Sequence, residues 1–362
     1  MEGLEVNPEF WRDRRVFLTG HTGFKGSWLS IWLQNMGAKV TGFALPPSTD
    51  PNLFELADVA SGMTSVLGDI RSAELLTKVM QEAQPEIVIH MAAQPLVRAS
   101  YEDPIETFST NVMGTVHLLE GARQARSVKA ILNVTTDKCY ENKEWHRSYR
   151  EIDPLGGHDP YSNSKACSEF VTASYRASFF NPARYAEHGV AVATARAGNV
   201  IGGGDYSKDR LIPDLIDAFR KGHAAAIRFP NATRPWQHVL EPLLGYLALC
   251  ERLVTEGPSW GEAWNFGPSG QGEHSVGWVA TELAALWGQG ARWDPTPDAS
   301  YHEATLLSLD ISKATSTLKW KPRLNVQDAL SLILDWENGL SAGNSPRAIV
   351  DGQIAAYTKI GA

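Results

Sequence analysis

Six short apolar runs in the first half of the chain predict buried β-strands. Most are separated from the next by a segment in which apolar residues recur at helical spacing. Strands that are apolar on both faces are typical of a parallel sheet covered by helices on both sides. The runs are RVFLTG (15–20), AKVTGFAL (38–45), TSVLGD (64–69), EIVIHMAA (86–93), KAILNVTT (129–136) and GVAVATARAG (189–198).

The first connecting segment, KGSWLSIWLQNMG (25–37), shows the helical pattern clearly. Its apolar positions recur every three or four residues, and Gly37 is well placed to end the helix. Strands that alternate with such helices predict an α/β protein with a Rossmann-like doubly wound parallel sheet. The apolar positions of this helix are Leu29, Trp32, Leu33 and Met36.

The texture of the sequence changes after about residue 200, where Gly, Pro and Trp become frequent and the expected elements are shorter. We expect residues 1–200 to form the Rossmann domain, with parts of 236–268 and 305–318 added to it. Residues 201–362 should form mainly a smaller C-terminal substrate-binding lobe. Because open α/β sheets bind ligands at the carboxyl ends of their strands, we expect the site between the two parts.

Composition narrows the choice of partners and of compartment. The 362 residues carry a net charge of −8 with a pI near 5.7, which argues against nucleic-acid and membrane partners. The three cysteines lack metal-ligand spacing, so we expect no metal site and a reducing compartment. The N-terminus has no signal-peptide core and no apolar run is long enough to span a bilayer, so a cytoplasmic location is expected.

A glycine-rich segment, TGHTGFKG (19–26), follows the first predicted strand and opens the first helix. A dinucleotide site needs a tight turn there, then a backbone that can approach a pyrophosphate, then amide hydrogens at a helix N-terminus. This position therefore predicts a dinucleotide cofactor. The residues expected to hold it are Gly20, Thr22, Gly23, Phe24 and Gly26, whereas Lys25 is given a minor role at most.

The ends of later strands refine the cofactor. The second strand ends in GFALPPSTD (42–50), which offers no clear acid for a ribose and no Arg for a 2′-phosphate, so NAD is favoured over NADP. Asp69 and Ile70 follow the third strand and are expected near the adenine. Ala92 and Ala93 follow the fourth strand, where small residues let a dinucleotide pass close to the backbone.

The segment DPYSNSK (159–165) predicts a reactive phenol. Asp159 is a suitable N-cap and Pro160 a suitable first helical residue, which places Tyr161 and Lys165 on one helix face. A nearby ammonium favours the phenolate, so Tyr161 could act as a base toward a sugar hydroxyl. Upstream, VTTDKCY (134–140) sets Thr136, Asp137 and Lys138 side by side at a strand's end.

Together these segments resemble the extended short-chain dehydrogenase/reductase superfamily, and within it the CDP-glucose 4,6-dehydratase family. The resemblance runs from about residue 11 to at least 340, and its most specific parts are TGHTGFKGSWL and TDKCY. Most sugar-nucleotide 4,6-dehydratases carry Glu where this chain has Lys138, and the CDP-glucose type carries Lys. The remaining segments are HMAAQPLVR, DPYSNSK, RAGNVIGGGD, RPWQHVLEP and WNFGP.

The resemblance implies a dehydration that proceeds through a temporary oxidation. NAD would oxidise sugar C4 while Tyr161, assisted by Thr136 and Lys165, takes the hydroxyl proton. Asp137 would then protonate the departing C6 hydroxyl. Lys138 would remove the C5 proton as an uncharged amine, or alternatively stay charged and stabilise the enolate oxygen. The product would be CDP-4-dehydro-6-deoxyglucose.

The resemblance also suggests substrate contacts and an assembly. A diphosphate calls for Arg and Asn donors, and the candidates are Arg98, Asn199, Arg210, Arg234 and His302. The helix predicted over 106–123 and the helix after Tyr161 would pair with their copies in a homodimer or a dimer of dimers. Two alternatives remain: a related 4-epimerase, decarboxylase or 4,6-dehydratase of another nucleotide sugar, and a dinucleotide-sensing protein without activity.

Overall fold

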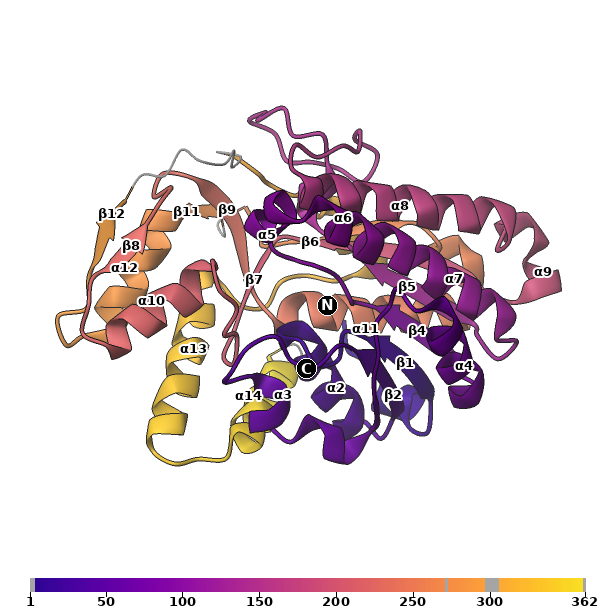
Figure 1. Cartoon of the computed structure of the whole chain (residues 1–362), viewed down its shortest axis with the longest axis horizontal. Helices are drawn as coiled ribbons and strands as arrows, with labels where there is room; N and C mark the ends of the chain where they lie inside the picture. The colour runs from indigo at the N-terminus through magenta and orange to yellow at the C-terminus, as the bar shows by residue number, and fades with distance from the viewer. Residues whose placement is uncertain (1–3, 271–272, 297–305, 361–362) are drawn as a thin grey trace.

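A parallel sheet of seven strands forms the centre of the molecule (Figure 1). The structure is a computed structural model of the chain, and residues 4–270, 273–296 and 306–360 are described. The strand order β10-β6-β5-β4-β1-β2-β3 is doubly wound, with its switch point between β1 and β4. The strands are β1 (Arg15–Thr19), β2 (Lys39–Ala44), β3 (Thr64–Leu67), β4 (Ile87–His90), β5 (Ala130–Val134), β6 (Ala191–Ala197) and β10 (Ala263–Phe266).

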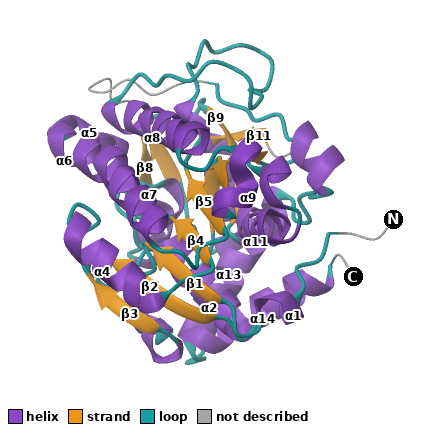
Figure 2. Cartoon of the chain, turned by 90° about the vertical axis from the view of Figure 1, so that its right-hand side faces the viewer, coloured by secondary structure: helices purple, strands orange, loops and turns teal. Residues whose placement is uncertain are grey.

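Helices cover both faces of this sheet (Figure 2). One face carries α2 (Phe24–Asn35), α11 (Leu240–Thr255) and α14 (Pro346–Lys359), and the other carries α4 (Ala73–Ala83), α7 (Gly114–Gln124) and α8 (Pro160–Ser178). The shorter helices are α1 (Pro8–Trp11), α3 (Leu53–Leu56), η1 (Val59–Gly62), α5 (Val97–Glu102), α6 (Pro104–Phe108), η2 (Ser109–Met113), η3 (Asp137–Cys139), η4 (Pro182–Arg184), α9 (Tyr185–His188), η5 (Gly257–Trp260) and η6 (Ala314–Leu318).

Alternation along each strand explains why both faces are apolar. In β1, Val16 and Leu18 join the core beneath α2 and α11, whereas Phe17 joins the core beneath α4 and α7. Since all three side chains are almost completely buried, the strand reads as an unbroken apolar run in the sequence. This is the pattern from which the parallel sheet was predicted, and the fold class is confirmed.

A smaller lobe lies beside the carboxyl ends of the strands, on the left of Figure 1. It has its own apolar core, which includes Ile212, Leu215 and Leu330. Two small sheets, β7-β9-β11 and β8-β12, support it. Its elements are β7 (Asn199–Ile201), α10 (Leu211–Arg220), β8 (Ala225–Ile227), β9 (Thr233–His238), β11 (Glu273–Ser275), α12 (Val276–Trp287), β12 (Trp293–Pro295) and α13 (Val326–Ser341).

The chain crosses between the two parts more than once. After β9 it returns as α11 and β10, and β10 pairs in parallel with β6 at the edge of the large sheet. The C-terminal α14 then packs against α2. No helix within the described ranges is long and apolar enough to cross a membrane.

The six predicted strands are confirmed with slightly shorter bounds, and Gly37 follows α2 with a positive φ of 79°. The single helix predicted over 106–123 is wrong in one detail, because a π-helical turn, η2, interrupts it. Asn111 in that turn is buried, accepts a hydrogen bond from the Gln94 amide at 2.8 Å and donates to Ser164 Oγ at 2.8 Å. The wider turn thus directs a polar side chain inward, where it ties the loop after β4 to α8.

Candidate active site

A short turn at the end of β5 carries the acid and the amine that the sequence sets side by side. Thr136 caps the turn: its Oγ1 accepts from the Lys138 amide at 3.3 Å and donates to Asp137 Oδ1 at 3.0 Å. Lys138 is half-buried, while Asp137 is only 2% exposed. The turn therefore keeps both groups at the carboxyl edge of the sheet, where ligands of such folds bind.

The surroundings of Asp137 favour the protonated form of its carboxyl group. Burial raises its pKa, although the charges of Lys138 and Arg234 act in the opposite direction. Its Oδ2 atom is buried and has no hydrogen-bond partner among the described residues. A buried carboxyl oxygen without a partner is costly when charged, so this atom is suited to give a proton to a bound ligand.

Tyr161 and Lys165 approach this turn from the first two turns of α8. Asp159 caps the helix by accepting from the Ser162 amide at 2.8 Å, and Pro160 is its first residue, as predicted. The Tyr161 side chain forms a hydrogen bond with Thr136. Lys165 Nζ donates to the Val134 carbonyl at 3.2 Å, which places the ammonium beneath the same strand end.

The electrostatics of Tyr161 differ from the expectation. Burial raises its pKa to about 12, and the hydrogen bond with Thr136 and the charge of Arg210 only partly oppose this. Burial also lowers the pKa of Lys165 to about 8, which weakens the ammonium as a partner for a phenolate. In this buried pair desolvation therefore outweighs the attraction that the sequence pattern suggested.

The glycine-rich loop has the shape that a dinucleotide requires. Gly20 has φ 78°, and a Cβ there would lie 2.8 Å from the Ala92 amide nitrogen. A Cβ on Gly26 would lie 2.0 Å from the Gly20 carbonyl oxygen, so only glycine permits this tight crossing. Gly23 begins α2 without a side-chain cap, which leaves the first amides of the helix to a phosphate. These residues fit a dinucleotide pyrophosphate.

The other predicted cofactor residues are distributed around this loop. Thr22 Oγ1 donates to the Leu45 carbonyl at 2.8 Å, which ties the loop to the end of β2. Asp69 is half-buried and pairs with Arg71 at 2.6 Å, while Ile70 is buried beside Gly114. Phe24, the first residue of α2, lies near Gly202, and Ala93 is half-buried in the segment after β4.

Lys25, to which a minor role at most was assigned from the sequence, makes a long-range contact in the structure. Its Nζ donates to Tyr246 Oη at 3.2 Å, and Tyr246 is fully buried on α11. Burial lowers the pKa of Lys25 to about 7, and the charges of Lys165 and Arg210 act in the same direction. Lys25 therefore lies close enough to Lys165 and Arg210 to feel their charges, and its place inside the glycine motif was the available signal.

The predicted substrate residues fall into two groups. Arg98 and Arg210 approach the segment 205–209, where Arg98 lies 3.8 Å from Asp209 and Arg210 lies 3.2 Å from Asp205. Arg228, which the sequence reading missed, pairs with the same Asp209 at 2.9 Å. The others lie at the lobe's strands or beyond the described residues: Asn199 is half-buried in β7, Arg234 is buried in β9 near Asp137, and His302 is in the range that is not described.

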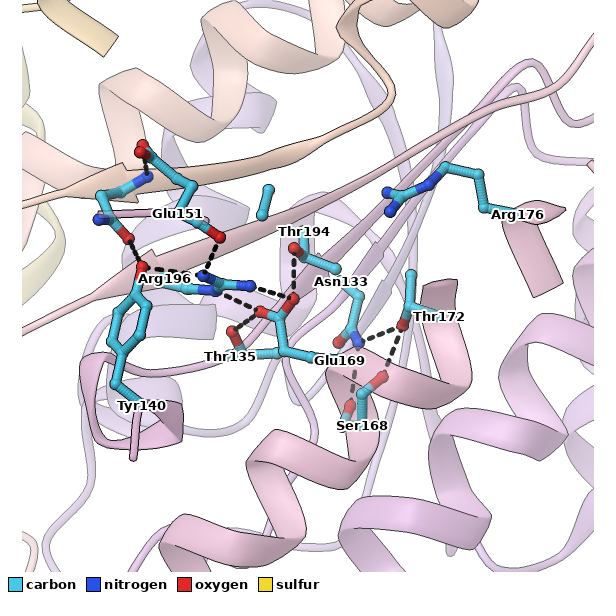
Figure 3. A network of polar contacts seen from close by, with 12 residues as sticks. Asn133, Thr135, Tyr140, Glu151, Ser168, Glu169, Thr172, Arg176, Thr194 and Arg196 are labelled. Carbon is cyan, nitrogen blue, oxygen red and sulfur yellow. Dashed lines mark hydrogen bonds and ion pairs between the residues drawn. The ribbon is translucent and has the colours of Figure 1, made fainter. Parts of the chain in front are cut away.

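A buried polar network includes Thr135 and Tyr140, which flank the turn (Figure 3). Glu169, one helical turn beyond Lys165, forms an ion pair at 3.0 Å with Arg196 of β6. The same carboxylate accepts from Thr135 at 2.5 Å and from Thr194 at 2.7 Å. All four side chains are at most 6% exposed. A buried network whose hydrogen bonds are satisfied in this way is rigid.

Comparisons with known proteins agree with this geometry. Residues 17–251 match the family described as GDP-mannose 4,6 dehydratase. A CDP-glucose 4,6-dehydratase of Salmonella typhimurium is 51% identical over 352 residues, which cover 97% of this chain and 98% of the relative. A dTDP-glucose 4,6-dehydratase of Streptomyces antibioticus is 30% identical and covers 76% of each chain.

A solved structure supports the fold. DesIV of Streptomyces venezuelae, a dTDP-glucose 4,6-dehydratase solved with NAD bound, superposes with a TM-score of 0.77. It is 25% identical, and the match covers 92% of this chain and 99% of that chain. Fold and site together define a nucleotide-sugar enzyme of the extended short-chain dehydrogenase/reductase class. The chain belongs to the GDP-mannose 4,6-dehydratase family.

Proposed function

We propose that this chain is a CDP-glucose 4,6-dehydratase, a lyase that converts CDP-D-glucose to CDP-4-dehydro-6-deoxy-D-glucose and water. One observation carries the proposal: Thr136, Asp137 and Lys138 form one turn beside Tyr161 in a chain that is 51% identical to such an enzyme along nearly its whole length. The choice of cytidine as the nucleoside rests on that relative.

The cofactor is NAD, held by the glycine-rich loop and the first amides of α2. Gly20, Gly23 and Gly26 give the loop its tight path, and Ala92 borders it after β4. When bound, NAD supplies reversible hydride chemistry, taking the hydrogen of sugar C4 and returning it to C6. Asp69, Ile70 and Ala93 are proposed to line the adenosine side of the same groove.

Tyr161 acts first, as the base that takes the proton of the C4 hydroxyl. Thr136, which already bonds to Tyr161, holds that hydroxyl in line with the phenol. Burial alone keeps the pKa of Tyr161 high, so forming the phenolate depends on nearby positive charge, and Lys165 supplies such a charge from the same helix face when it is protonated. The step leaves a ketone at C4, which makes the neighbouring C5 hydrogen acidic.

Asp137 and Lys138 then complete the loss of water. Lys138 takes the C5 proton while Asp137 gives its proton to the C6 hydroxyl, so the C6–O bond breaks and a C5–C6 double bond forms. After hydride return at C6, Lys138 gives a proton back to C5. The sugar loses one water, with no net oxidation. Tyr161 releases the proton of the C4 hydroxyl to solvent and Asp137 regains one, so both return to their starting states.

Substrate recognition is proposed for the residues at the edge of the lobe. Arg98, Arg210 and Arg234 would meet the diphosphate, since guanidinium groups match its oxygens in pairs. Asn199 of β7 would add an amide donor. His302 remains a candidate for the nucleoside, and it falls outside the described residues.

Asp137 and Lys138 speak against the alternative reactions. A 4-epimerase needs oxidation and reduction at C4 only, so an acid and an amine beside Thr136 would have no task. The reaction in heavy water separates the two: a dehydratase places deuterium at C5 and removes the C6 hydroxyl, whereas a 4-epimerase does neither. A dinucleotide sensor would not need Thr136, Tyr161 and Lys165 together at the end of one strand.

A homodimer, or a dimer of dimers, is proposed to form through α6, η2 and α8. Four large apolar side chains are exposed on these elements, and monomers seldom leave such a group open to water. They are Ile105 at 81%, Phe108 at 36%, Met113 at 46% and Phe170 at 57% exposure. A cytoplasmic location is proposed from the three free thiols, Cys139, Cys167 and Cys250.

The decisive experiment offers the purified protein CDP-, dTDP-, GDP- and UDP-glucose in turn, each with NAD. Only the CDP sugar should be converted efficiently to a product lighter by one water, as read by mass spectrometry. Preference for another nucleotide would refute the proposed substrate, and a product of unchanged mass would refute the proposed reaction.

A further inference from the structure

The buried pair of Glu169 and Arg196 reaches both ends of the catalytic turn. At one end, Thr135 Oγ1 donates to Glu169 Oε1 at 2.5 Å. At the other end, Arg196 donates to Tyr140 Oη at 2.8 Å, and Tyr140 Oη in turn donates to Asn265 Oδ1 at 2.7 Å. The turn that carries residues 136–138 is therefore spanned by one connected set of side chains (Figure 3).

The surroundings of Glu169 and Arg196 favour the charged form of both side chains, so the hydrogen bonds that they make are restricted in direction. Burial would raise the pKa of Glu169, but the charge of Arg196 and the hydrogen bonds from Arg196, Thr135 and Thr194 hold it below its usual value. Burial would lower the pKa of Arg196, but neighbouring negative charges raise it instead. Hydrogen bonds to charged groups are stronger and more restricted in geometry than neutral ones.

We propose that Glu169 and Arg196 are positioning residues that fix the Thr136–Asp137–Lys138 turn in its reactive geometry by clamping Thr135 and Tyr140. This inference rests on the proposed function, because it assigns the pair a task in that reaction. The pair is bonded to the two side chains that flank the turn, Thr135 and Tyr140, and the charge of Glu169 also acts on Lys165. A small displacement of the turn would be costly, since displacements of about 1 Å can lower a rate by about a hundredfold.

The network itself supplies a matched pair of variants. Thr135 and Thr194 are both buried and each gives one hydrogen bond to a different oxygen of the Glu169 carboxylate. Each oxygen also accepts from Arg196, at 3.0 Å in both cases. Thr135→Val and Thr194→Val therefore remove equivalent bonds, but only Thr135 adjoins the catalytic turn.

The proposal predicts that the two variants differ in kcat and not in stability. Thr135→Val should lower kcat by about tenfold or more and leave KM for the nucleotide sugar within about twofold, whereas Thr194→Val should lower kcat by less than about threefold. Both should lose similar thermal stability. Equal losses of kcat in the two variants would reduce the pair to a structural role, and unchanged kcat in Thr135→Val would overturn the clamp.

Tyr140→Phe provides a second test at the other end of the turn. It removes the hydroxyl that accepts from Arg196 but keeps the ring that stacks on Tyr149, with centroids 5.2 Å apart. It should lower kcat without raising KM, as Thr135→Val does, so the test survives if Thr135→Val fails to fold. An increase in KM with unchanged kcat would contradict the proposal.

Amide hydrogen exchange separates failure of the clamp from failure of the proposed function. Relative to the parent protein, Thr135→Val should speed exchange in residues 136–139, and Thr194→Val should not. This measurement needs no substrate. If the parent protein converted no nucleotide sugar, the proposed function would fall, while exchange would still show whether the turn depends on its clamp; equal exchange in both variants would count against the clamp alone.

Discussion

At the scale of single residues, burial decides the chemistry of the site. Burial raises the pKa of Asp137, and one of its carboxyl oxygens has no partner in the described structure, which suits the proposed role of proton donor. Lys138, the next residue, is half-buried and nearer to solvent. Two neighbours in the chain thus receive different environments and can serve as acid and base in one step.

Lys138→Ala should separate oxidation from loss of water. The variant should still oxidise C4 and accumulate bound reduced cofactor, because Thr136 and Tyr161 are untouched, while product formation falls by about 10²-fold to 10⁴-fold. Tyr161→Phe should fail earlier, with NAD bound but no reduced cofactor formed. Absorbance of the reduced nicotinamide and mass analysis of the sugar distinguish the two stages.

Lys138→Arg decides between the two roles considered for the amine. An arginine keeps the positive charge but cannot lose its proton. If Lys138 is the base, the variant should stall as Lys138→Ala does. Near-normal turnover would instead show that a positive charge near the enolate oxygen is sufficient.

What the sequence revealed about these residues depended on how local their contacts are. Thr136, Asp137 and Lys138 lie within one turn, and Asp159 and Tyr161 within another, so their arrangement follows from short spacing. The contact of Lys25 with Tyr246 joins residues 221 positions apart, and no local pattern encodes it. The net rise in the pKa of Tyr161 was not predicted from the sequence for the same reason, because burial depends on the whole fold.

At the scale of elements, one buried carboxylate fastens the C-terminal helix to the sheet domain. Glu241 of α11 accepts from the amides of Arg323 and Leu324 at 2.9 Å and 2.7 Å, and from Tyr357 Oη of α14 at 2.8 Å. It is completely buried, and burial raises its pKa from 4.5 to about 7. The docking of α14 is therefore sensitive to the charge of Glu241.

Glu241→Gln should remove part of the pH dependence of stability. Because the pKa of Glu241 is higher in the folded state, the folded protein binds the extra proton between about pH 4.5 and 7, and stability from this group is lost as pH rises through that range. Relative to the parent, the variant should gain roughly 3 kcal/mol between about pH 4 and about pH 8.

Denaturant unfolding at several pH values measures this gain. Glu74→Gln, an exposed change on α4, controls for the loss of one negative charge. A stability difference between Glu241→Gln and the parent that stays constant with pH would show that Glu241 titrates alike in both states.

Element boundaries were predictable where hydrogen bonding is local and less so where tertiary contacts intervene. Asp159 and Pro160 marked the start of α8, and Gly37 marked the end of α2. The π-helical turn at 109–113 was missed because its partner, the loop at Gln94, lies far away in the sequence. A helical pattern in the sequence does not show which side chains the fold will draw inward.

At the scale of the whole molecule, the apolar surface on α6 and α8 should control assembly. Phe170→Glu, at 57% exposure, places a charge in the proposed interface and should yield monomers in sedimentation or light scattering. Ile152→Glu is a matched control, since this residue is 82% exposed but lies outside those helices. Unchanged assembly of Phe170→Glu would place the interface elsewhere.

The return of the chain from the lobe as α11 and β10 limits how such enzymes can be recombined. In a chimera joined at residue 200, the second parent would supply the lobe. It would also supply α11 and the edge strand β10, which must pack on the sheet of the first parent. Nucleotide preference in this architecture is thus not carried by an exchangeable cassette. A change of nucleotide preference is therefore expected to be easier by single substitutions than by exchange of the lobe, because an exchanged lobe would bring α11 and β10 into the large sheet.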